Sequence, residues 1–96
     1  MQYRLRGKVW VYPGAAAWYF VNVSKKISAE IKENFGDSGR GFGSIRVRVT
    51  VGTTSWKTSV FPDSKSGTYL LPIKAEVRKK EGITDDTMLS YTIEIQ

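Results

Sequence analysis

Apolar and polar residues alternate along the first part of the chain, from Tyr3 to Tyr12. This period of two predicts a half-buried strand that ends at Pro13-Gly14. The segment Ala17 to Val23 is rich in aromatic and β-branched residues, so it predicts a second strand paired with the first. The polar side of the first strand carries Arg4, Arg6, Lys8 and Trp10.

A helical pattern follows Ser24, because Ile27, Ile31 and Phe35 recur every four residues. Ser24 is a favourable N-cap, and Gly36 is a favourable residue at a helix end. The sequence therefore predicts an amphipathic helix of about three turns. The glycine-rich segment that follows is predicted to be a connecting loop.

The second half of the chain shows the same kinds of pattern. The predicted strands span 44–51, 54–61, 68–71 and 87–95. Pro72 is expected to open a second helix, because a missing N–H costs nothing in the first turn, and Gly82 is expected to end it. Ile73 and Val77 would form the apolar stripe of this helix. The sequence thus predicts six strands and two short helices in the order ββαβ, ββαβ.

The two halves also resemble each other in sequence, at a constant offset of 46 residues. At this offset Ile27-Ser-Ala-Glu-Ile-Lys aligns with Ile73-Lys-Ala-Glu-Val-Arg, and Trp10 aligns with Trp56. If the two tryptophans are equivalent, Lys57 takes the position of an apolar residue. Either the two halves bury different faces, or the tryptophans lie at the ends of the fold under the helices.

This self-similarity predicts a single domain, residues 1–96, built from two degenerate repeats of about 8–50 and 54–96. Two such repeats can bury their sheet faces against each other, with the helices covering the open ends. The prediction is a mainly β fold with two short helices, arranged as a small pseudo-twofold barrel.

Cysteine and histidine are absent from the 96 residues. Their absence excludes disulfides, thiolate metal sites and histidine acid–base catalysis, so we expect neither an enzyme nor a bound cofactor or metal. No apolar run approaches the roughly 20 residues that a membrane-spanning helix needs. We therefore expect a soluble protein without membrane contacts. The absence of cysteine favours the cytoplasm, and we expect a monomer.

Several motifs together resemble a known family. They are Lys8-Val-Trp-Val-Tyr-Pro, Val21-Asn-Val-Ser, Trp56-Lys-Thr-Ser-Val-Phe-Pro and Tyr69-Leu-Leu-Pro-Ile-Lys-Ala-Glu-Val-Arg-Lys. In these motifs the chain is similar to a prokaryotic family catalogued as a domain of unknown function, family 1905, whose members are sometimes joined to bacteriocin-protection domains. The resemblance implies a double-split β-barrel capped by helices, a fold shared with dimeric swapped-hairpin transcription regulators. It implies no activity.

Lysine and arginine outnumber aspartate and glutamate by 15 to 9, which gives a formal charge of +6. A small basic protein attracts polyanions at low salt. Cations on two strands would share one surface if the strands are neighbours, and a tryptophan there would stack on bases. The candidates for this nucleic-acid surface are Arg4, Arg6, Lys8, Trp10, Arg46 and Arg48. The alternative is an ordinary solvated face, partly neutralised by Glu94.

A second candidate site lies at the start of the predicted second helix. Lys74 stands in its first turn, although a cation there opposes the helix dipole, and Arg78 follows one turn later. Together with free amides at the helix start, these cations would bind a phosphate or carboxylate group. Lys57 and Ser59 of the neighbouring strand are expected to contribute. The alternative is a solvent-exposed lysine whose repulsion is screened.

Two other patterns indicate no ligand. Arg40-Gly-Phe-Gly43 matches the opening of the RNP1 motif of RNA-recognition domains, but Ser44 and Val47 stand where stacking aromatic residues are required. The same glycines follow a helix and precede a strand, which is the reverse of a nucleotide-binding loop. Core packing is expected for Trp18, Tyr19 and Phe20.

Together these patterns predict a non-enzymatic binding module for an anionic partner, either nucleic acid or a phosphorylated ligand. The alternative is a protein-interaction or structural domain whose positive charge is incidental. The salt dependence of binding separates the two.

Overall fold

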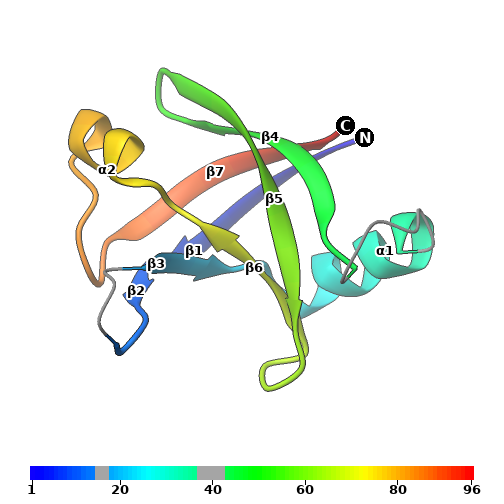
Figure 1. Cartoon of the computed structure of the whole chain (residues 1–96). Helices are drawn as coiled ribbons and strands as arrows, with labels where there is room; N and C mark the ends of the chain where they lie inside the picture. Colours follow the sequence, from blue (N-terminus) through cyan, green and yellow to red (C-terminus); the bar gives the residue numbers. More distant parts are fainter. Residues whose placement is uncertain (15–17, 37–42) are drawn as a thin grey trace.

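The computed structural model describes residues 1–14, 18–36 and 43–96, and this part of the chain forms seven strands and two helices (Figure 1). The strands are β1 (Gln2–Lys8), β2 (Trp10–Val11), β3 (Tyr19–Asn22), β4 (Ile45–Val51), β5 (Thr54–Asp63), β6 (Thr68–Pro72) and β7 (Met88–Ile95). The helices are α1 (Lys25–Phe35) and α2 (Ala75–Glu81). Neighbouring strands are antiparallel in the order β1-β7-β4-β5-β6-β3-β2, and they form one curled sheet. The predicted mainly β fold is confirmed.

The first predicted strand is divided at Val9, which has no exposed surface. Before Val9 the chain pairs with β7, and after it the chain pairs with β3. At the crossing point the Val9 amide donates to Thr87 O at 2.8 Å, and Val9 O accepts from the Asp86 amide at 2.9 Å. The prediction of one continuous strand is therefore wrong, because the chain changes partners in its middle.

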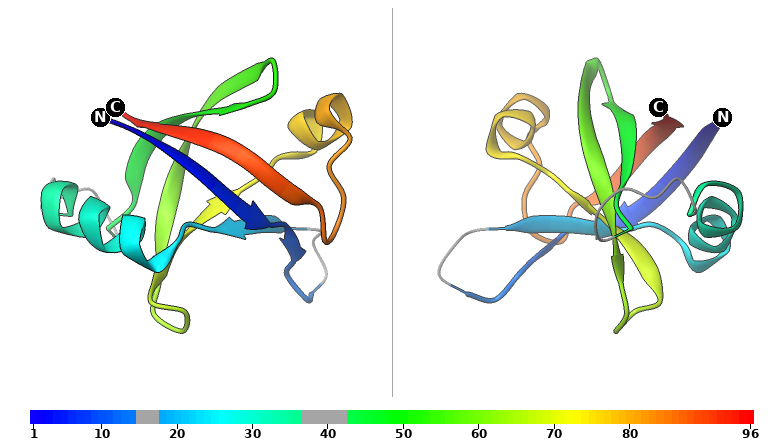
Figure 2. Two further views of the ribbon diagram at one scale, coloured as in Figure 1. Left: turned by 180° about the vertical axis from the view of Figure 1, so that it is seen from behind. Right: turned by 45° about the vertical axis from the view of Figure 1, so that its right-hand side comes forward.

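The inward face of the curled sheet forms the hydrophobic core. Every second residue of β4 is buried, from Ile45 to Val51, and the same alternation buries Leu89, Tyr91 and Ile93 in β7. The alternation predicted for these two strands is thus confirmed. Figure 2 shows α1 and α2 on opposite sides of the sheet, with the two chain ends side by side.

The start of α1 is set by Ser24, whose hydroxyl accepts a hydrogen bond from the Ile27 amide at 3.2 Å. The predicted N-cap and the helix of about three turns are confirmed. Within α1, the hydroxyl of the buried Ser28 accepts from the Tyr69 amide at 3.0 Å and donates to Val23 O at 3.2 Å. The Val23 amide donates directly to Tyr69 O at 2.9 Å. In a regular antiparallel pair, the Tyr69 amide would donate to Val23 O. The Ser28 hydroxyl bridges these two groups instead, and this joins α1 to the sheet.

The second helix starts later than predicted. It begins at Ala75, after the N-cap Lys74. Pro72 is the last residue of β6 and does not open the helix, and Ile73 precedes the helix and is not part of its apolar stripe. The predicted end is confirmed, because Gly82 terminates α2 with a left-handed φ of 65°.

Because α2 starts late, the offset of 46 residues does not relate the starts of the two helices. The offset relates Gly36 to Gly82, which follow the two helices, but the N-caps Ser24 and Lys74 are 50 positions apart (24 to 74). The difference arises because α1 has 11 residues and α2 has 7. The alignment of the first helical segment with the second is therefore wrong at the helix starts.

Trp10 and Trp56 face different ways. Trp56 is 8 % exposed and points into the core from β5, opposite Val49. Trp10 is half-buried on β2 and packs against the rings of Tyr12 and Phe20. Of the two alternatives derived from the sequence, the first holds: the two halves bury different faces.

Two predictions lie outside the described residues, namely the loop motif Arg40-Gly-Phe and the start of the second predicted strand at Ala17. β5 extends two residues beyond its predicted end at residue 61, to Asp63, and residues 64–67 form the turn to β6. Within the described ranges, the helices are too short or too polar to cross a membrane.

Candidate functional site

The cations predicted for nucleic acid lie on the outer side of β1 and β4, on a surface that we call the basic face. It comprises Arg4, Arg6, Lys8, Arg46 and Arg48, all of which are exposed. β7 lies between β1 and β4. Arg4 pairs with Thr92 of β7, and Thr92 pairs with Thr50 of β4, so these three side chains lie on the same side of the sheet. Arg46 and Arg48 share that side with Thr50, because alternate residues of a strand face the same way. Glu94 lies opposite Arg48, so a carboxylate interrupts this face.

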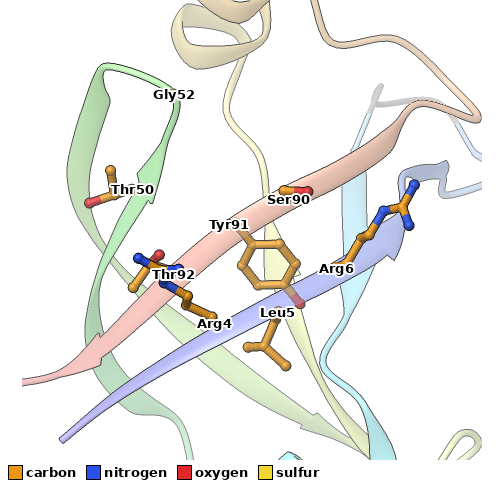
Figure 3. Close-up of a pocket in the computed structure, with 8 residues that line it drawn as sticks. All are labelled: Arg4, Leu5, Arg6, Thr50, Gly52, Ser90, Tyr91 and Thr92. Carbon is orange, nitrogen blue, oxygen red and sulfur yellow. The ribbon is translucent and has the colours of Figure 1, made fainter.

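A hollow of about 550 Å³ opens beside Arg4 and Arg6 of the basic face (Figure 3). Arg4 and Arg6 line it from β1, and Figure 3 shows Tyr91 and Leu5 between these two arginines. Burial raises the pKa of Tyr91 far above its usual range, so the phenol beneath the hollow stays neutral. Thr50, Ser90 and Thr92 add aliphatic hydroxyls to the lining. The hollow thus offers guanidinium and hydroxyl donors to phosphate oxygens.

Trp10 belongs to a different part of the surface. Its indole N–H donates to Asn22 Oδ1 at 2.6 Å, and its ring centroid lies 5.3 Å from that of Phe20. Asn22 Nδ2 donates in turn to Thr68 Oγ1 at 3.0 Å. Trp10 is therefore fixed in an aromatic cluster with Tyr12 and Phe20, and it does not line the hollow beside Arg4 and Arg6.

Three of the four predicted anion-site residues meet between β5 and the start of α2. Lys57, Lys74 and Arg78 line a pocket of about 390 Å³, which we call the cationic pocket. The fourth residue, Ser59, lies opposite Arg46 further along β5 and does not line this pocket. The larger apolar residues of the lining are Trp18, Tyr19, Trp56, Pro72 and Ile73.

Arg78 is held in place by an aromatic ring. Its Cζ lies 3.8 Å from the centroid of the Tyr19 ring, which is a cation–π contact. Its Nη1 is buried, and within the described part of the chain no acceptor is within hydrogen-bonding reach of this atom. Since buried donors in folded proteins are nearly always paired, the unpaired Nη1 marks Arg78 as the candidate anion contact of this pocket.

Lys74 lies one turn before Arg78, and the Arg78 amide donates to Lys74 O at 3.1 Å. The Lys74 ammonium is 3.6 Å from Glu76 Oε1, and the two side chains are 54 % and 71 % exposed. No side chain caps the start of α2, but Glu76 places a carboxylate in its first turn, beside Lys74. The charged side chains that line the pocket are those of Lys57, Lys74 and Arg78.

Sequence reasoning missed the aromatic side of the pocket. Trp18 was expected in the core but is 54 % exposed, and Phe20 packs against it outside the core. Tyr19 does pack against the core, as expected, and its ring also contacts Arg78. The available signal was the strand period of two, because Trp18 and Phe20 alternate with the buried Val21 and so face outward.

Comparison with known proteins places these features within a family. No curated protein matches the chain. The profile of the family described as Domain of unknown function (DUF1905) matches residues 6–93. This range contains all of the cationic pocket and, except for Arg4, all of the basic face. With nearly the whole chain matched, the protein belongs to the DUF1905 family.

Proposed function

We propose that the protein is a non-enzymatic binding module for an anionic ligand, and that the cationic pocket holds the phosphate or carboxylate group of that ligand. The observation that carries the proposal is Arg78, whose buried Nη1 has no acceptor among the described residues although Lys57 and Lys74 line the same pocket. Charge-assisted hydrogen bonds from such cations are stronger than neutral ones. The chain contains no histidine or cysteine, which supports binding without catalysis.

The contact between Lys74 and Glu76 does not prevent this role. The two side chains are largely in water, where an ion pair contributes at most about 1 kcal/mol. A ligand anion that also contacts Arg78 gains more than Glu76 alone provides. Glu76 is therefore a competitor that a phosphate or carboxylate group displaces.

The first test is alanine substitution in the cationic pocket. Arg78→Ala is expected to weaken the binding of inorganic phosphate or pyrophosphate about 10-fold, because a buried charge-assisted donor is lost. Lys57→Ala and Lys74→Ala are each expected to weaken it roughly 3-fold, because their charges are better solvated. Titration followed by amide chemical shifts, at constant ionic strength, measures these affinities.

Lys79→Ala is the matched control, because Lys79 is an exposed cation of α2 that does not line the pocket. An equal loss of affinity in Lys79→Ala and Arg78→Ala would show that only net charge matters, and would contradict the proposal. Lys74→Ala is expected to change the free energy of unfolding by less than about 1 kcal/mol, since it removes one exposed ion pair. A larger destabilisation would assign Lys74 a structural role and remove it from the site.

Nucleic acid is a second candidate ligand, and it is favoured by the hollow on the basic face. Arg4 and Arg6 border that hollow together with hydroxyls from β4 and β7. These donors suit phosphate oxygens and do not read base edges, so the expected binding has little sequence preference. Glu94 weakens this candidate, because its carboxylate lies opposite Arg48.

The second test measures the binding of labelled single- and double-stranded oligonucleotides. If the basic face contacts about four phosphates, affinity should fall roughly 100-fold between about 50 and 200 mM salt, because counterions are released. Arg4→Gln with Arg6→Gln should reduce both the affinity and its salt dependence, whereas Lys79→Gln should not. Undetectable binding at about 50 mM salt and micromolar protein would exclude this candidate and leave the charge of the basic face incidental.

A more detailed description of the fold is also a proposal. We infer that the curled sheet is a double-split barrel of two degenerate repeats, of about 8–50 and 54–96. Two features support this: β1 and β2 are consecutive yet lie at opposite ends of the strand order, and α1 and α2 lie on opposite sides of the sheet. The unequal helices and the differently oriented tryptophans account for the weak sequence match between the halves.

A further inference from the structure

The rim of the cationic pocket carries an exposed indole. Trp18 lines the pocket and is 54 % exposed, although large aromatic side chains are usually buried. The ring of Phe20 stacks on Trp18 at an interplanar angle of 11° and a centroid distance of 6.0 Å, and Phe20 does not itself line the pocket. The indole is therefore supported from outside the pocket and presents apolar surface to it.

Other walls of the pocket are apolar and rigid. Trp56 is 8 % exposed and Ile73 is 2 % exposed, so both are fixed in the core while reaching the pocket. Pro72 adds a ring of restricted conformation at the end of β6. The part of the pocket wall that these three residues form is therefore apolar.

The cations and the apolar walls of the pocket favour different chemical groups of a ligand. Arg78, with its unpaired Nη1, and the two lysines favour a negative group. A small hydrated anion would satisfy these groups but leave the indoles in contact with water. A ligand with a flat apolar body beside its charge satisfies both parts, and a volume of about 390 Å³ falls within the usual range for small-molecule sites.

We propose that the ligand of the cationic pocket is an aromatic anion, a planar ring joined to a phosphate or carboxylate group. The ring lies against Trp18 and the neighbouring apolar wall, and the anionic group accepts hydrogen bonds from Arg78. This inference rests on the proposed anion-binding function and narrows it to one class of ligand. A nucleoside monophosphate and an aromatic carboxylate share this chemistry, and the experiment separates them.

The experiment compares ligands with and without an aromatic ring system. Calorimetric titrations use adenosine 5′-monophosphate against ribose 5-phosphate, and indole-3-acetate against acetate. In at least one pair, the aromatic member is expected to bind about 10-fold or more tightly, because stacking and apolar burial add affinity. The pair with the larger ratio identifies the phosphate or the carboxylate as the source of the charge.

Variants of Trp18 then test whether the difference in affinity between the aromatic and the ring-free ligand arises in the cationic pocket. Trp18→Ala and Trp18→Leu are expected to lower the ratio about 5-fold or more while leaving the ring-free anions within about 2-fold. The leucine variant retains apolar surface, which guards against a loss of folding. Tyr12→Ala is the matched control, because Tyr12 is 53 % exposed in the same aromatic cluster but does not line the pocket.

The outcomes are distinguishable. Equal affinities within both pairs, or an unchanged ratio in both Trp18 variants, overturn this inference and leave the proposed anion-binding function standing. Failure of all four ligands to bind at about 10 mM overturns both. A ratio that falls equally in Tyr12→Ala also overturns the inference, because the ring would then bind outside the pocket.

Discussion

Replacing Leu71 with alanine is expected to lower the free energy of unfolding by about 3 kcal/mol, the largest effect expected of the substitutions considered for this protein. Leu71 has no exposed surface and lies opposite Val21 in the sheet. Truncation removes its buried methyl groups and leaves a cavity between rigid strands that cannot close around it. Urea denaturation followed by tryptophan fluorescence measures the change.

Leu70→Ala is the matched control, one residue away on the same strand. Leu70 is only half-buried and lies opposite Phe61, which is 44 % exposed, so its side chain faces away from the core. Its truncation is expected to lower the free energy of unfolding by less than about 1 kcal/mol. Similar losses for the two leucines would contradict the assignment of inner and outer faces to β6.

Replacing Ser28 with alanine is expected to lower the free energy of unfolding by about 2 kcal/mol, which is unusual for a serine. The Ser28 hydroxyl is the acceptor for the Tyr69 amide and the donor to Val23 O. Without it, both backbone groups stay buried and lose this partner. The Tyr69 amide should also exchange its hydrogen with solvent faster than in the unmodified protein.

Ser90→Ala provides the comparison for this substitution. Ser90 is an exposed residue of β7, so loss of its hydroxyl is expected to change the free energy of unfolding by less than about 0.5 kcal/mol. If Ser28→Ala is as mild as Ser90→Ala, and the Tyr69 amide keeps its exchange rate, then α1 is not joined to the sheet through this hydroxyl.

The elements that could be predicted from the sequence are those determined by local patterns. β4 and β7 each bury one face, so alternating residues report them directly, and Ser24 caps α1 through a contact only three residues long. The division at Val9 had no such signal, because alternation continues from β1 into β2 while the hydrogen-bonding partner changes. The start of α2 was misplaced because a proline suits the end of a strand as well as the first turn of a helix.

The candidate site shows the same division between local and long-range information. Lys74 and Arg78 could be paired from their spacing, since residues four apart on a helix are neighbours. The grouping of Lys57 with these residues required the further prediction that its strand lies beside the helix, and the pocket lining agrees with this. Ser59 was grouped with Lys57 but does not line the pocket. The outward orientation of Trp18 follows from its alternation with the buried Val21, but a run of three aromatic residues obscures that alternation.

The pairing of β1 with β7 has a consequence for how the chain reaches its folded state. Gln2 lies opposite Glu94, so this pairing joins the two ends of the chain and requires closure of a loop of nearly its full length. The hairpin of β4 and β5 needs only a two-residue turn, and we expect it to form early, with β1 docking late and slowly. Until β1 docks, one edge of β7 remains open to pairing with another chain. Refolding at high protein concentration should therefore lose material to aggregation at this edge.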